Sequence, residues 1–126
     1  MIEIPWPFCA LALLICVGGW WAYAATKEDK RQLDAKIEAF CAALYHYGGQ
    51  AQITMVFEEM AELQDVLCKF LRGRVDGDTY ANIAEELADV GIMLDQMAIE
   101  FEVEDAVAEL RAFKVCRLRE RIETDD

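Results

Sequence analysis

Proline, basic residues and histidine are all scarce in this chain. Its two prolines, Pro5 and Pro7, lie at the amino terminus, so no proline interrupts a helix after residue 7. Twelve Lys and Arg stand against 24 Asp and Glu, a formal charge of -12 over 126 residues. That balance excludes the basic surface that binds a nucleic-acid polymer. An apolar content of 56% equally excludes a disordered chain.

Cysteine and histidine are too scattered to form a zinc site. The five cysteines contain no CxxC pair, and none has a metal-ligand spacing with His46. An odd, scattered set of this kind is typical of reduced thiols, which places the body of the chain in the cytosol. No cysteine has a histidine partner that would activate it as a nucleophile. The cysteines are Cys9, Cys16, Cys41, Cys68 and Cys116.

One stretch, residues 4–25, has no charged residue. About 20 apolar residues suffice for a helix that crosses roughly 30 Å of hydrocarbon. Aromatic residues lie near both ends, as in interfacial belts, and basic residues follow the stretch while Glu3 precedes it. The positive-inside rule then places the amino terminus outside and the body in the cytoplasm. We therefore expect a transmembrane anchor over residues 1–26 and a helical domain over residues 27–126.

Other interpretations of this segment stay open. Ala22-Tyr23-Ala24 has the small-x-small form that signal peptidase accepts, although the cationic region of a signal peptide is missing. The segment could also lie upstream of the true translation start, or pack as an apolar arm inside an oligomer. In those last two cases the protein would be soluble in the cytoplasm.

After the apolar stretch, apolar residues recur in alternating steps of three and four, the period of one helix face. Thr26 and Asp29 resemble a capping box at the start of the first helix. Gly48-Gly49 separates the first two helices, and the Gly- and Asp-rich residues 73–78 separate the next two. Short connections of this kind predict an all-α, antiparallel four-helix bundle. The apolar seams cover residues 33–47, 53–70, 83–101 and 103–122.

Acidic residues lie beside the seam on the second and third helices. Glu59 and Glu62 are three residues apart and share a face, and Glu86 and Asp89 repeat this arrangement. Partial burial of such like charges costs on the order of several kcal/mol per ion unless a counter-charge is present. A divalent cation is the economical counter-charge. Hard oxygen ligands favour Mg²⁺, with Mn²⁺ as the alternative, over zinc or copper.

Two further considerations limit the metal chemistry. A ferritin-like di-iron bundle needs ExxH pairs, and the sequence has none. The acids at the start of the fourth helix are not matched by a second acidic cluster on another helix, so we expect them to be solvated. These are Glu102, Glu104, Asp105 and Glu109.

The run Glu58-Glu59-Met60-Ala61-Glu62, followed after 23 residues by Glu86-Leu87-Ala88-Asp89, resembles a known signature. It is the EExxE…ExxD pattern of the MazG-like, all-α nucleoside triphosphate pyrophosphohydrolases, small members of which occur in phages and prophages. The likeness covers roughly residues 50–122 and leaves out the apolar segment. It implies Mg²⁺-dependent cleavage between the α and β phosphates, which yields a monophosphate and pyrophosphate. The metal ligands that it implies are Glu59, Glu62, Glu86 and Asp89.

The resemblance implies further roles and partners. Glu58 lies about 100° around the helix from Glu59, so we expect it to orient a ligand or accept a proton from water. The resemblance also implies a homodimer or homotetramer with the nucleotide bound partly between subunits. A small-residue face agrees with a close helix approach across such an interface. Its members are Ala84, Ala88, Gly91 and Ala98.

Basic and amide side chains must complete a nucleotide site, because the acids alone repel a triphosphate. Basic residues near a helix carboxyl terminus also complement the helix dipole, so each candidate has a second explanation. The candidates are Lys114, Arg117, Lys69 and Arg72 for the phosphates, and Asn82 and Gln96 for a base edge.

A non-enzymatic protein is the competing hypothesis. In it the heptad-like seams bind another helix, the acids are solvated, and the chain is a membrane-tethered adaptor or oligomerisation module. Release of pyrophosphate from a nucleotide separates the two hypotheses.

Overall fold

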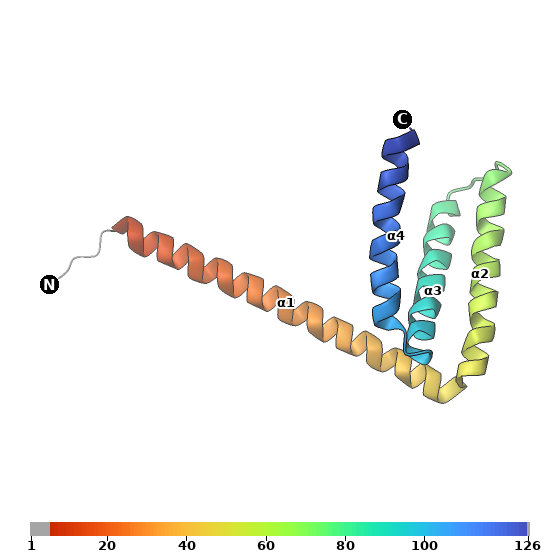
Figure 1. The fold of residues 1–126 in the computed structure, drawn as a ribbon, viewed down its shortest axis with the longest axis horizontal. Helices are drawn as coiled ribbons and strands as arrows, with labels where there is room; N and C mark the ends of the chain where they lie inside the picture. The colour runs from red at the N-terminus through yellow and green to blue at the C-terminus, as the bar shows by residue number, and fades with distance from the viewer. Residues whose placement is uncertain (1–5, 126) are drawn as a thin grey trace. The chain divides into compact units, whose positions relative to one another are not determined.

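The computed structural model describes the backbone of residues 6–125 and the side chains of residues 22–124. Every regular element in the described residues is helical, so the prediction of an all-α fold with four helices is confirmed (Figure 1). The helices are α1 (Trp6–Tyr47), α2 (Gly49–Leu71), α3 (Thr79–Glu100) and α4 (Glu104–Asp125).

The chain divides into two compact units, residues 1–39 and residues 40–126. In the second unit, α2 and α3 lie side by side and run antiparallel, and α4 contacts α3 (Figure 1). The connections that produce this arrangement are short, as expected for antiparallel neighbours. Gly48, with φ of +85°, ends α1 and separates it from α2, as the sequence predicts.

The described side chains of the first unit, residues 22–39, are all exposed. Thr26 lies inside α1, and its hydroxyl donates to the carbonyl of Tyr23 at 2.9 Å. The predicted capping box at this position is therefore wrong. The reason is that the turn before Thr26 is already helical, so no free amides remain there for a cap to satisfy.

No helix in the described part of the chain is both long and apolar enough to cross a membrane. The predicted anchor, residues 4–25, falls mostly outside the residues whose side chains are described. Only residues 22–25 of it are inside that range, and their side chains are exposed. Membrane insertion of the segment thus stays a prediction.

A Schellman motif ends α2. The amide of Arg74 donates to the carbonyl of Lys69 at 3.1 Å, and that of Gly73 donates to the carbonyl of Phe70 at 2.9 Å. The motif requires a left-handed residue after the helix, and Gly73 supplies it with φ of +71°. It returns the backbone of Arg74 to the last turn of α2.

The same motif ends α3, but without glycine. The amide of Val103 donates to the carbonyl of Ala98 at 2.9 Å, and that of Glu102 donates to the carbonyl of Ile99 at 3.1 Å. Glu102 occupies the left-handed position with φ of +54°. A side chain there costs roughly 1–2 kcal/mol, so the sharp turn into α4 is strained.

Few side chains in the described residues are buried. Phe40 and Met93 are the buried apolar ones, while many seam residues of α2, α3 and α4 are exposed. A Cβ added at Gly91 would meet no atom within 4 Å, so no described helix approaches the small-residue face there. One chain therefore covers its apolar seams only in part. Large seam side chains left exposed are Met60, Leu67, Leu87, Leu94, Leu110, Phe113 and Leu118.

We predict that Glu102→Gly stabilises the protein by about 1 kcal/mol, because glycine relieves the left-handed strain and loses part of that gain in chain entropy. Gly73→Ala, at the equivalent position after α2, should destabilise it by a similar amount. Urea unfolding curves measure both. An unchanged or lower midpoint for Glu102→Gly would show that the turn is not strained.

Candidate functional site

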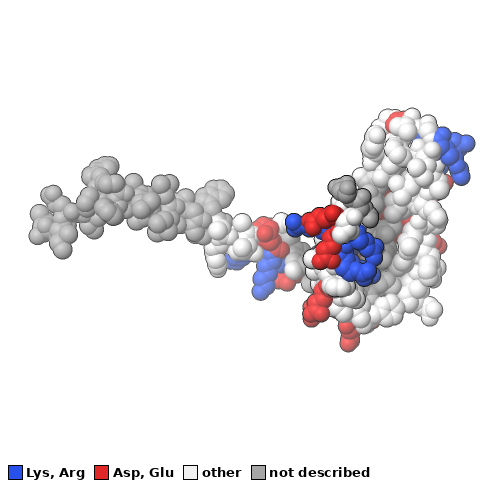
Figure 2. All heavy atoms as spheres, turned by 45° about the horizontal axis from the view of Figure 1, so that its top comes forward, with Lys and Arg blue, Asp and Glu red and all other residues white. Residues whose placement is uncertain are grey.

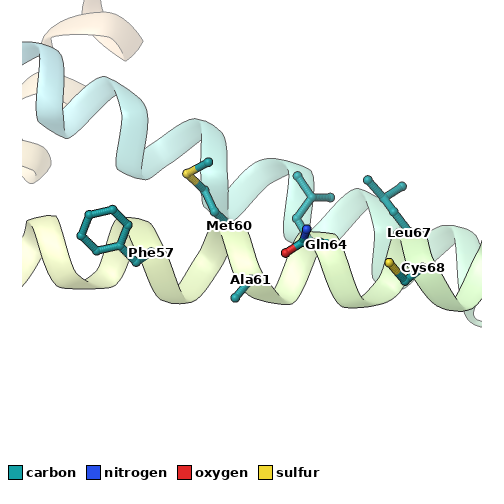
Figure 3. Close-up of a pocket in the computed structure, with 7 residues that line it drawn as sticks. Phe57, Met60, Ala61, Gln64, Leu67 and Cys68 are labelled. Carbon is teal, nitrogen blue, oxygen red and sulfur yellow. The ribbon is translucent and has the colours of Figure 1, made fainter.

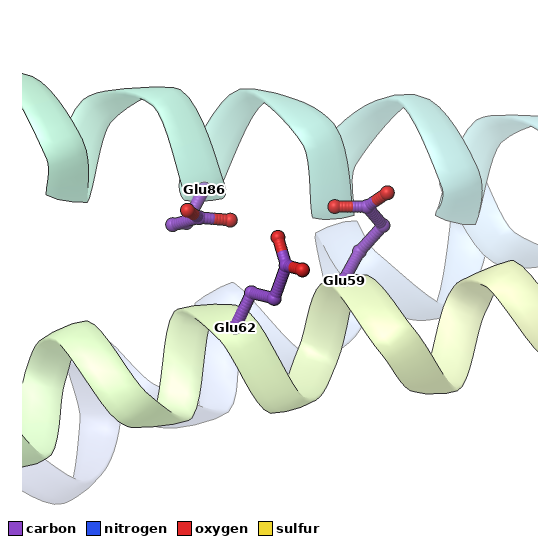
Figure 4. Close-up of side chains that lie close together, drawn as sticks. All are labelled: Glu59, Glu62 and Glu86. Atoms are coloured by element: carbon purple, nitrogen blue, oxygen red, sulfur yellow. The ribbon is translucent and has the colours of Figure 1, made fainter.

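Three glutamates from the two facing helices α2 and α3 come together. Glu59 and Glu62 extend from α2 toward Glu86 on α3 (Figure 4). One carboxylate oxygen from each lies within 4.8 Å of the others. The spacing of three places the first two on one face of α2, and the antiparallel hairpin brings Glu86 to their level.

The register of the α2–α3 hairpin creates this meeting. Because α2 and α3 run antiparallel, a later residue of α2 lies beside an earlier residue of α3. Residues that are far apart in sequence therefore become neighbours along the hairpin. The neighbouring pairs are Gly49 and Glu100, Glu59 and Asp89, Glu62 and Glu86, and Val66 and Asn82.

Asp89 and Glu58 belong to the surroundings of the three glutamates. The charge of Asp89 raises the pKa of both Glu59 and Glu86. Glu58 is exposed, and its charge contributes least of the four carboxylates that raise the pKa of Glu59. The cluster therefore has four members, Glu59, Glu62, Glu86 and Asp89, which we call the acidic site. Glu58 lies at its edge and is not counted in it.

The acidic site is partly desolvated, and the described residues place no counter-charge at it. Burial is the largest cause of the raised pKa of both Glu59 and Glu86, and neighbouring carboxylates are the next. No Lys or Arg is among the described charges that shift either group. Oε2 of Glu86 is buried without a hydrogen-bond partner in the described part of the chain. An oxygen-only set of this kind, with an unpartnered oxygen, suits a hard divalent cation.

The two predicted phosphate-binding residues near the end of α2, Lys69 and Arg72, differ in whether they line a hollow. Lys69 lines a hollow of about 300 Å³ between the ends of α2 and α3, and Arg72 is not among its lining residues. Arg74 lines the hollow instead. It belongs to the basic group Lys69, Arg72 and Arg74 that closes the second helix, of which Lys69 and Arg72 were the residues expected to bind phosphate. Gly73 was the signal that could have identified Arg74, because a Schellman motif returns the next residue toward the helix.

Lys114 and Arg117 lie together on α4, where they line a separate hollow of about 330 Å³ with Arg121. Figure 2 shows Lys and Arg side chains gathered in two places on the second unit, over α4 and where α2 joins α3. Among the described residues, neither Lys114 nor Arg117 contributes to the pKa shifts of the acidic site.

The two predicted base-binding residues lie at opposite ends of the acidic row. Asn82 lines the same hollow as Lys69. Gln96 is buried, with 5% exposure, and its Nε2 donates to the sulfur of Met93 at 3.9 Å. Its Oε1 is buried and has no partner in the described residues. Gln52 on α2 is also buried. It precedes Glu59 by seven residues, which is two helical turns, and this spacing in the sequence indicates that it shares the face of the acidic site.

No known protein family, curated protein or solved structure matches this chain.

We predict that Glu59→Gln raises the melting temperature of the metal-free protein at pH 7, because it removes a partly buried charge that repels its neighbours. The folded-state pKa of Glu59 lies above its ordinary value of 4.5, so the folded protein binds this proton more tightly than the unfolded chain. Stability is therefore lost as the pH rises from 4.5 through the raised pKa. Thermal unfolding followed by circular dichroism measures the effect.

The gain from Glu59→Gln should vanish well below pH 4.5, where Glu59 is protonated in both states. Glu109→Gln removes the same charge from an exposed position on α4 and is the matched control. An equal gain in both variants would mean that only the overall charge matters.

Proposed function

We propose that this chain is an Mg²⁺-dependent nucleoside triphosphate pyrophosphohydrolase of the MazG-like, all-α type. It would convert a nucleoside or deoxynucleoside triphosphate to the monophosphate and pyrophosphate. The observation that carries the proposal is the meeting of Glu59, Glu62 and Glu86 on facing helices. Asp89 lies beside them, and none of the described charges that shift their pKa values is a cation. These four acids, together with Glu58, are also the ones whose spacing resembles the family signature.

The donor set fits the proposed metal. All four side chains offer carboxylate oxygens, which Mg²⁺ prefers and which Mn²⁺ also accepts. The unpartnered Oε2 of Glu86 is a ligand atom that nothing in the described chain engages. Bound Mg²⁺ would neutralise phosphate oxygens and lower the pKa of a water at the α phosphorus.

The chain's own residues would then have distinct roles. Glu59, Glu62, Glu86 and Asp89 would hold the metal. Glu58, which is exposed at the edge of the acidic site, would orient a ligand or accept the proton of the attacking water. The oxygen of that water would bond to the α phosphorus as the bond from the α phosphorus to the bridging oxygen breaks and pyrophosphate leaves. No covalent intermediate is needed.

Other candidate residues would position the substrate. Lys114 and Arg117 are available for phosphate contacts from α4. The unpartnered side-chain carbonyl of Gln96 can accept a hydrogen bond from an amino group on a base edge. That bond would offset the free-energy cost of burying the carbonyl oxygen without a partner.

The exposed apolar faces of α2 and α4 also fit an adaptor that binds another helix. Such a protein would release no pyrophosphate from any nucleotide, whereas the proposed enzyme would. A nucleotide panel assayed with Mg²⁺ therefore decides between the two functions.

We predict that Glu62→Ala and Asp89→Ala each abolish turnover, since each removes a proposed metal ligand. The loss should exceed the about 10- to 100-fold that follows removal of an outer-shell partner. Pyrophosphate release measures it, and the helical circular-dichroism signal should be unchanged. Mg²⁺ should raise the melting temperature of the wild type but not that of either variant.

Glu109→Ala, an exposed acid on α4, is the matched control and should keep normal turnover. Near-normal activity in Glu62→Ala or Asp89→Ala would contradict the metal assignment. Absence of pyrophosphate release in the wild type, for every common or modified nucleotide, would favour the adaptor.

We also propose that the chain self-associates as a homodimer or homotetramer. A hollow of about 430 Å³ lies along the exposed face of α2 (Figure 3), and one of about 420 Å³ lies on α4. Each is lined by residues of one helix, so no other described helix covers it. A second copy is the occupant that this fold favours, because one copy leaves too few apolar side chains buried to form a core. The main apolar lining residues are Phe57, Met60, Leu63 and Leu67 on α2, and Val107, Leu110, Val115 and Leu118 on α4.

We predict that Met60→Lys and Leu110→Lys each weaken self-association by at least about tenfold, because burial of such a side chain contributes about 1.5–3 kcal/mol. Light scattering coupled to gel filtration over a concentration series measures the change. Val75→Lys, in the exposed connection between α2 and α3, should leave the mass unchanged. A wild type that stays monomeric at high concentration would refute the interface.

The membrane tether over residues 4–25 and the cytoplasmic position of the domain stay predictions, with a soluble cytoplasmic protein as the alternative. Neither changes the proposed chemistry, since every candidate site residue belongs to the second unit.

A further inference from the structure

A small polar hollow lies at the end of the α2–α3 hairpin, beside the acidic site. Its volume of about 300 Å³ is at the lower end of the range for small-molecule sites. Figure 2 shows Lys and Arg side chains gathered at this end of the second unit. The lining residues are Val66, Lys69, Arg74, Asp76, Thr79 and Asn82.

Two turns build this hollow. The Schellman motif after α2 ties the amide of Arg74 to the carbonyl of Lys69. On the other side, the buried Thr79 donates its hydroxyl to Oδ1 of Asp76 at 2.8 Å and accepts from the amide of Asp76 at 2.8 Å. Oδ1 also accepts from the amide of Asp78 at 3.2 Å. Oδ1 of Asp76 is thus engaged by the loop itself.

The two cations of the hollow retain free donors. Nζ of Lys69 lies 2.7 Å from Oδ2 of Asp65, which engages one of its three N–H groups. Arg74 has no ion-pair partner in the described residues, so its guanidinium keeps its fork of N–H donors. Asn82 adds an amide. An ammonium, a guanidinium and an amide around one hollow form a donor set that recognises phosphate oxygens.

The position of the hollow relates it to the acidic site. Val66 follows Glu62 by one helical turn, and Asn82 precedes Glu86 by one turn. One turn is about 5.4 Å along the axis. A phosphate chain with one end at the acids would therefore reach the hollow with its other end. The hollow thus brings two cations together in a chain whose formal charge is -12.

We propose that this hollow binds the diphosphate end of a nucleoside triphosphate, with Arg74 and Lys69 holding the β and γ phosphates while the α phosphate lies at the acidic site. The nucleotide as the source of the diphosphate rests on the proposed function, whereas binding of a diphosphate by the hollow does not. Free pyrophosphate has the same chemistry and is the probe for the hollow alone.

Calorimetry on the full chain tests the site, with pyrophosphate as the ligand, first without divalent cations and then with Mg²⁺. Arg74→Gln and Lys69→Gln should each raise the Kd without divalent cations by about 10- to 100-fold, as expected for a charge-assisted hydrogen bond. Arg72→Gln makes the same charge change two residues away, outside the hollow, and should stay within about twofold of the wild type, since an exposed charge contributes little. Glu62→Gln should lose the gain in affinity that Mg²⁺ gives, because it removes a proposed metal ligand.

Equal effects of Arg74→Gln and Arg72→Gln, or no effect of either, would overturn the site whether or not the chain hydrolyses nucleotides. Arg74-dependent pyrophosphate binding without any turnover would leave the hollow standing and refute the proposed enzyme. In an active enzyme, Arg74→Gln should raise the KM for the triphosphate at least about tenfold, while Arg72→Gln should not. An unchanged KM in Arg74→Gln would assign the diphosphate elsewhere, with the hydrolase intact.

Discussion

Repulsion among carboxylates that two helices hold face to face is the constraint on which the second unit depends. The α2–α3 pairing must keep Glu59, Glu62 and Glu86 together although burial and their mutual charge disfavour the ionised forms. In the described residues no basic side chain offsets this at the cluster itself. A protein that retains such an arrangement sacrifices stability at one place, which is typical of functional sites.

The polar residues along the hairpin lie in the order that the proposed nucleoside triphosphate substrate would require. The buried Gln96 lies at one end, the acids lie in the middle, and Lys69 and Arg74 lie at the loop end. In the proposed complex, the base, the α phosphate with its metal and the diphosphate would occupy these positions in turn. The hairpin register thus relates three chemically different regions that no single helix contains.

Packing within one chain does not account for the apolar content of the second unit. Its seams have the helical period, yet Phe40 and Met93 are the apolar side chains buried in the described residues. The exposed faces of α2 and α4 are what self-association would cover, and the same faces are what an adaptor would use. Pyrophosphate release, rather than the apolar surface, therefore distinguishes enzyme from adaptor.

The sequence by itself determined the helices, the glycine-rich connections and the acidic rows, because helical period and turn preference are local properties. The hydrogen bond of Thr26 inside α1 shows where a local signal failed: a capping pattern cannot reveal that the preceding turn is helical. Only the tertiary structure decided that Glu86 meets Glu59, that Arg74 rather than Arg72 lines the hollow, and that Gln96 is buried. Register and burial depend on how two helices pack together, and that information is absent from the period of either helix alone.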